Sequence, residues 1–137
     1  MSSSSIFSSP GFMRNVLRVD ALSCVACGLL QVVFPSQMAE LLRLPTPLLA
    51  YTGEFLLAYA AAIFFISTRQ PIPRMFVGVL VAGNLGWAVA CVILLVSGGV
   101  QPTIFGTGYV LLHALTVAVL AELQYFGLRA TVLKPAW

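Results

Sequence analysis

Five polar side chains lie inside otherwise apolar stretches of this 137-residue chain: Asp20, Glu54, Asn84, His113 and Glu122. Polar groups within a bilayer are energetically costly, so they usually face the interior of a helical bundle and often carry protons or ions. This set predicts a candidate proton or ligand site. Glu54 would be its outer carboxylate, the amide and imidazole groups its middle, and Asp20 and Glu122 its inner pair.

A structural interpretation of the same residues competes with the functional one. Glu122 is about 10 Å from one predicted membrane face, close enough for its side chain to reach the interface. Asp20 could pair with Arg129 or Arg14 across the bundle, and the amide and imidazole could simply bridge helices. Glu54 fits this interpretation least well, because a single arginine lies on its side of the membrane.

One face of the first predicted helix carries two cysteines and two polar residues, separated by 4, 3 and 4 positions: Asp20, Cys24, Cys27 and Gln31. We expect this face to point inward. Cys24 and Cys27 have the spacing of a redox pair, but hydrocarbon disfavours the thiolate that disulfide exchange requires, so packing is the favoured role. A metal site formed with Cys91 and His113 is not expected, nor is any cofactor.

Four long apolar segments must position these residues, at about 13–34, 46–68, 72–97 and 102–128. A hydrocarbon core of about 30 Å needs about 20 helical residues, and each segment is long enough. With 60% hydrophobic residues, 8% charged residues and a mean hydropathy of +1.00, a soluble globule is excluded. The sequence predicts an all-α polytopic membrane protein whose four transmembrane helices form an up-down-up-down bundle.

The parts outside the spans are short. Residues 1–12 are predicted to be a disordered lead-in rather than a signal peptide, and residues 129–137 a cytoplasmic tail. Between the first two spans, residues 35–45 predict a short interfacial helix at the periplasmic surface, which Ser36 could cap. When Asp20 is laid over Asn84, the first two spans resemble the last two, so the bundle could be a repeat of two hairpins.

The basic residues indicate orientation. Six of the seven fall on one side of the predicted membrane, and Arg43 falls on the other: the six are Arg14, Arg18, Arg69, Arg74, Arg129 and Lys134. The positive-inside rule therefore predicts that both termini are cytoplasmic. Because these residues are scattered and the net charge is only +3, we expect no nucleic-acid partner. The expected partner is the lipid bilayer, with a second copy or a membrane complex as further candidates.

Several short motifs resemble those of a known group of proteins. They are Phe34-Pro35-Ser36, Leu41-Leu42-x-Leu44-Pro45, Gly53-x-Phe55-Leu56-Leu57, Gly106-Thr107-Gly108-Tyr109 and Ala121-Glu122-Leu123-Gln124-Tyr125. In these the chain resembles a broad group of small, uncharacterised four-span proteins of the bacterial inner membrane. The resemblance implies a four-helix inner-membrane fold and supplies no established catalytic residues.

No complete catalytic constellation accompanies the polar residues, so we expect a protein that is not an enzyme. It would be an accessory or structural subunit of the bacterial inner membrane, or a binder of a small apolar ligand. The alternative is a small proton-coupled transporter that uses Glu54 and Asp20, and a less favoured one is a membrane thiol oxidoreductase. Trp87 is also unusual, because it lies near the middle of the third span whereas tryptophan favours membrane interfaces.

Overall fold

The computed structural model describes residues 6–133. This part of the chain contains four long helices and one short helix. The long helices are α2 (Pro10–Val33), α4 (Thr46–Ser67), α5 (Arg74–Val96) and α6 (Ile104–Leu133), and the short one is α3 (Pro35–Leu42). All four long helices are long and apolar enough to cross a membrane. The predicted all-α bundle with four spans is confirmed, and the chain is a multi-pass membrane protein. The predictions for residues 1–5 and 134–137 lie outside the described residues.

Two helix boundaries differ from those predicted by three residues or more. Helix α2 begins at Pro10, because the Ser9 hydroxyl accepts a hydrogen bond of 3.1 Å from the Phe12 N–H and so caps the helix three residues earlier than expected. Helix α6 runs to Leu133, so residues 129–133 of the predicted tail are helical. Both spans therefore continue past the strictly apolar segments from which they were predicted.

The predicted cap of α3 is wrong. The N-cap residue is Phe34, which makes no side-chain capping bond, and Pro35 occupies the first helical position. Proline lacks an N–H and its φ angle suits this position, so the helix starts two residues too early for Ser36 to cap it. The backbone of Arg43, in the left-handed conformation, ends α3.

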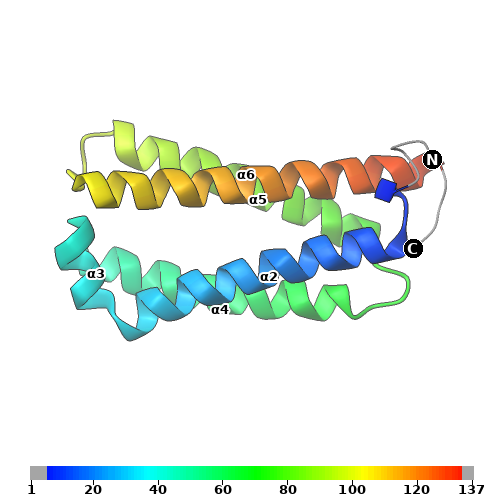
Figure 1. Cartoon of the computed structure of the whole chain (residues 1–137), viewed down its shortest axis with the longest axis horizontal. Coiled ribbons are helices and arrows are strands. Elements are labelled where there is room, and N and C mark those ends of the chain that lie inside the picture. The colour runs from blue at the N-terminus through cyan, green and yellow to red at the C-terminus, as the bar shows by residue number, and fades with distance from the viewer. Residues whose placement is uncertain (1–5, 134–137) are drawn as a thin grey trace.

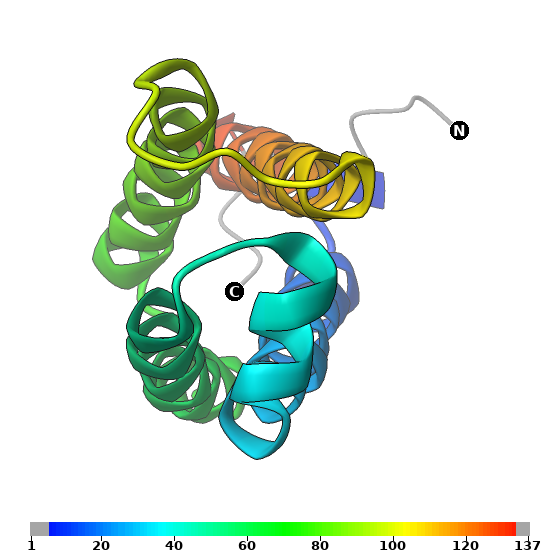
Figure 2. The ribbon, with the colours of Figure 1, turned by 90° about the vertical axis from the view of Figure 1, so that its left-hand side faces the viewer.

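The long helices pair as two antiparallel hairpins. Helix α2 packs along α4, and α5 packs along α6, while the two hairpins meet mainly where α2 touches α6. The start of α2 and the end of α6 lie together, opposite α3 (Figure 1), and an end-on view shows α3 lying across the near end of the bundle (Figure 2). A symmetric repeat would pack α4 against α5 as α2 packs against α6. Instead α4 and α5 share almost no backbone contact, although they are consecutive in the chain.

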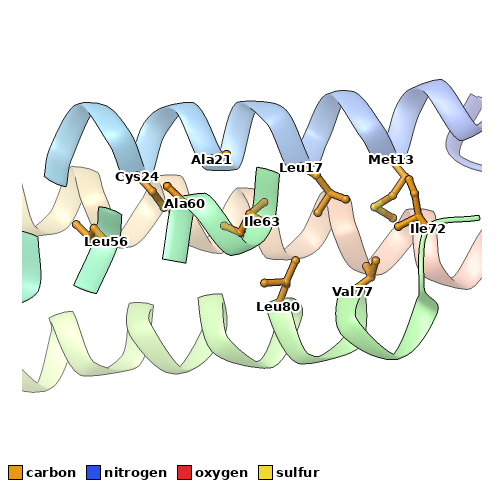
Figure 3. Packing of buried hydrophobic residues seen from close by; sticks show 10 residues of the cluster. All are labelled: Met13, Leu17, Ala21, Cys24, Leu56, Ala60, Ile63, Ile72, Val77 and Leu80. Atoms are coloured by element: carbon orange, nitrogen blue, oxygen red, sulfur yellow. The ribbon is translucent and has the colours of Figure 1, made fainter. Parts of the chain in front are cut away.

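Most of the core follows the first hairpin. One cluster runs from Met13 and Leu17 on α2, through Leu56 and Ile63 on α4, to Leu80 on α5 (Figure 3). We call the end where α2 starts the basic end, because five arginines lie towards it: Arg14, Arg18, Arg69, Arg74 and Arg129. We call the opposite end the α3 end. A smaller apolar cluster closes it, formed by Leu42, Leu44, Leu49 and Val110.

Helix α3 is fastened to the start of α6. The Thr103 N–H donates to the carbonyl of Leu42 at 3.1 Å, and the Thr103 hydroxyl donates to the carbonyl of Leu41 at 2.8 Å. Gly106 permits this approach, since a β-carbon there would collide with the carbonyl oxygen of Leu42. The α3 end is thus closed by backbone contacts that tolerate no side chain at position 106.

Alanine at position 106 should therefore loosen the α3 end. We expect Gly106→Ala to lower the free energy of unfolding by about 1–3 kcal/mol, because backbone rather than a flexible side chain would have to move. Unfolding of the purified protein in detergent, followed by circular dichroism, measures the effect. Gly108→Ala is the matched control, because a β-carbon at that position meets no atom within 4 Å. Equal stability of the two variants would contradict the expectation.

Candidate functional site

A buried carboxylate lies between the two hairpins with two amides around it. The Asn84 Nδ2 atom donates to Asp20 Oδ2 at 2.9 Å, and Gln124 Nε2 donates to the same oxygen at 2.6 Å. The Asn84 amide also donates to Gln124 Oε1 at 3.2 Å. All three side chains are at most 2% exposed. We call Asp20, Asn84 and Gln124 the Asp20 cluster, and it joins α2 of the first hairpin to both helices of the second.

The hydrogen-bond partners of Asp20 are neutral side chains. Besides the two amides, the Cys24 thiol lies 3.7 Å from Asp20 Oδ1, and the Tyr59 hydroxyl donates to Asn84 Oδ1 at 3.4 Å. The predicted pairing of Asp20 with an arginine is wrong. Arg14 instead donates to a backbone carbonyl at position 69, and Arg129 lies over the ring of Tyr125. A buried carboxylate is therefore satisfied by amide donors in place of a cation.

The other two predicted carboxylates lie elsewhere. Glu54 and Glu122 are both exposed on the outer faces of their helices, α4 and α6. Neither side chain is therefore part of the buried Asp20 cluster. Of the five predicted residues, the structure joins Asp20 directly to Asn84, and it adds Gln124, which was not among the predicted site residues.

His113 belongs to a separate, partly open pocket between the hairpins, nearer the α3 end. We call it the Trp87 pocket; it is lined by Gln31, Leu44, Leu48, Leu49, Thr52, Trp87, Cys91, Leu94, Tyr109, Val110 and His113. All four long helices contribute to it. Its volume is about 70 Å³, several times the ~10–15 Å³ that one water molecule needs. Apart from a few polar atoms, its lining is apolar and aromatic.

Some of these polar atoms are paired with one another. Gln31 Nε2 donates to the Tyr109 hydroxyl oxygen at 2.6 Å, and the Thr52 hydroxyl donates to Gln31 Oε1 at 2.7 Å. Two others are not paired. Trp87 Nε1 and His113 Nε2 are both buried, and neither has a hydrogen-bond partner within the described residues. An indole N–H can only donate, whereas an imidazole nitrogen donates or accepts according to its tautomer.

Aromatic rings cross the bundle beside this pocket. Phe55 on α4 stacks on Trp87 on α5, with centroids 5.4 Å apart and planes 9° apart. Trp87 in turn meets the ring of His113 at 6.1 Å, and His113 stacks on Tyr109 at 6.4 Å. The mid-span position of Trp87, unusual for a membrane tryptophan, thus places a flat aromatic wall between α4 and α6. The stacked Phe55 and Trp87 rings bridge α4 and α5, whose backbones share almost no contact.

The predicted inward face of the first helix is confirmed. Asp20, Cys24 and Gln31 are buried and Cys27 is half-buried. The cysteines are free thiols, and Cys24 packs in the core beneath Asp20. Within residues 6–133, no group of three or more His, Cys, Asp or Glu side chains could hold a metal ion. The face therefore serves both sites: its Asp20 end enters the Asp20 cluster and its Gln31 end lines the Trp87 pocket.

Comparisons of the chain with protein-family models, with curated proteins and with solved structures found no match.

Proposed function

We propose that this protein is a non-enzymatic membrane protein that binds a small, flat and largely apolar molecule in the Trp87 pocket. The observation that carries the proposal is the pair of buried, unpartnered polar atoms, Trp87 Nε1 and His113 Nε2, lining one pocket. Buried polar groups are nearly always hydrogen-bonded, so such a pair in an apolar cavity marks a place where a ligand gains specific contacts.

The pocket constrains the chemistry of its ligand. The Trp87 indole requires a hydrogen-bond acceptor, such as a carbonyl or ether oxygen, and His113 supplies a second polar contact. The ring of Trp87, which stacks on Phe55 outside the pocket, favours a flat molecule that can lie against it. Since the pocket lies between membrane-spanning helices, the ligand would come from the bilayer. An aromatic ketone or a quinone has this combination of properties.

We further propose that the protein lies in the bacterial inner membrane with both chain termini in the cytoplasm. The excess of arginine at the basic end supports this orientation, since cytoplasmic loops are enriched in basic residues. Terminal reporter fusions test it. Activity of a cytoplasmic reporter at both ends is expected, and activity of a periplasmic reporter at either end would contradict it.

Removing the indole donor tests the proposed ligand site. The full chain is purified in mild detergent, its bound small molecules are identified by mass spectrometry, and the retained compound is titrated back by calorimetry. We expect Trp87→Phe to weaken its binding about tenfold, the effect of losing one hydrogen bond from a buried donor. Phenylalanine keeps an aromatic ring next to Phe55 but has no N–H group to donate.

Filling the pocket gives the control for this experiment. Cys91→Phe places a ring in the cavity and should abolish retention of the compound, whereas Ile93→Phe adds the same ring on the exposed face of α5 and should not. If the wild-type protein and Cys91→Phe retain the same molecules in the same amounts, the pocket is not the binding site.

A further inference from the structure

A second, larger hollow lies between α4 and α5, towards the basic end. Its wall is apolar and includes Ala62 and Phe65 on α4 and Phe76 and Val79 on α5, while Arg69 lines it just beyond the end of α4. Its volume is about 560 Å³. We propose that this α4–α5 groove binds an anionic phospholipid, with an acyl chain along the apolar wall and the phosphate at Arg69.

The groove follows from how the hairpins meet. Helices α2 and α6 pack together on one side of the bundle, whereas α4 and α5 share almost no backbone contact on the other. The rings of Phe65 and Phe76 flank the resulting space, and both are about half exposed, at 56% and 47%. In a four-span bundle this surface faces hydrocarbon, so a lipid chain is the molecule at hand to fill it.

The charge of the lipid headgroup should determine which lipids bind the groove. The Arg69 guanidinium lies 4.0 Å from the centre of the Phe65 ring, which holds it at the mouth of the groove. Arg14 donates a hydrogen bond of 3.2 Å to the Arg69 carbonyl, so a second guanidinium lies close by. Guanidinium groups bind phosphate through paired hydrogen bonds, and basic pockets between membrane helices accept acidic headgroups. Arg69 therefore complements an anionic headgroup, and Arg14 adds positive charge near its backbone.

The acyl chain by itself gives little selectivity, because an apolar groove offers a lipid tail about the same environment as the bilayer. Preference for one lipid over another must therefore come from Arg69 and its surroundings. Two lipids with identical tails and different headgroups separate these contributions. Phosphatidylglycerol should bind more tightly than phosphatidylcholine, and the difference should depend on the charge at position 69.

The test uses the purified full chain and native mass spectrometry. Dioleoyl phosphatidylglycerol and dioleoyl phosphatidylcholine are titrated separately, and the ratio of their affinities is measured. We expect Arg69→Gln to lower the preference for phosphatidylglycerol about fivefold, the contribution of one basic residue near a membrane surface. Arg129→Gln is the matched control, because Arg129 also lies over an aromatic ring towards the basic end but does not line the groove.

Substitutions at two neighbouring alanines distinguish lipid binding in the groove from lipid binding elsewhere on the surface. Ala62→Trp fills the groove and should reduce binding of both lipids, whereas Ala61→Trp adds the same bulk on the exposed face of α4 and should not. Equal affinity of the wild-type protein for both lipids, or equal effects of Arg69→Gln and Arg129→Gln, would overturn the proposal. Cys91→Phe should leave phosphatidylglycerol binding unchanged, so this result is independent of the Trp87 pocket.

Discussion

Asn84→Leu should destabilise the bundle by about 2–3 kcal/mol, the usual effect of removing a partner from a buried charged or strongly polar group. Asn84 gives hydrogen bonds to both Asp20 and Gln124 and accepts one from Tyr59, so its loss leaves three polar side chains with fewer partners. The free energy of unfolding, measured by steric trapping in mixed micelles, reports the change. Asn15→Leu makes the same substitution at an exposed position of α2 and is expected to change little.

The Asp20 cluster should also behave non-additively. Replacing Asp20, Asn84 and Gln124 together by leucine removes every charge and amide at once, and such complete replacement is often close to neutral. The triple variant is therefore expected to be more stable than Asn84→Leu alone. If Asn84→Leu is no less stable than Asn15→Leu, the hydrogen bonds between the hairpins do not contribute to stability.

Leucine at position 53 should force α2 and α4 apart. A β-carbon on Gly53 would lie 2.7 Å from the β-carbon of Gln31 and 3.1 Å from the carbonyl oxygen of Gly28, closer than side chains normally approach. We expect Gly53→Leu to lower the free energy of unfolding by about 2–3 kcal/mol, at the upper end for an overpacked interior. Displacement of Gln31 should also disturb the Trp87 pocket, so retention of its ligand should fall.

Gly86→Leu is the control for this crossing. A β-carbon on Gly86 meets no atom within 4 Å, so a leucine there extends away from the bundle. Its stability should stay close to that of the wild-type protein. If both variants lose similar amounts of unfolding free energy, the close approach of α2 and α4 does not explain the effect of Gly53→Leu.

The spans could be predicted because length and apolar character alone identify a membrane helix. The inward faces were harder to predict, since lipid is as apolar as the protein core and hydrophobic periodicity is weak in such helices. The buried residues of α4 nevertheless recur every three or four positions: Leu49, Gly53, Leu56, Ala60, Ile63 and Ser67. Glu54 falls between them, so helical geometry places it on the exposed face of α4. Its charge alone was the reason for predicting it as a site residue.

The same periodicity would have found Gln124. Buried positions on α6 include Val110, Ala114, Val117, Ala121 and Gln124, again three or four apart. Glu122 was predicted as a site residue because it is charged, but it lies on the exposed face of α6. The contact of Gln124 with Asp20 joins residues 104 positions apart, and no local pattern encodes such a pairing. Cys24 and Gln31 were placed correctly because both share a helix face with Asp20.

The division of the Asp20 cluster between the hairpins bears on how the protein is made. Asp20 belongs to the first hairpin, whereas both amides that bond to it belong to the second. Asp20 precedes both amides in the chain, so it is synthesised before them. The first hairpin therefore contains a carboxyl group whose two amide donors are supplied only by the second hairpin. A chain that stops after α4 would lack both amide donors, and its first hairpin would carry the Asp20 carboxyl group without them.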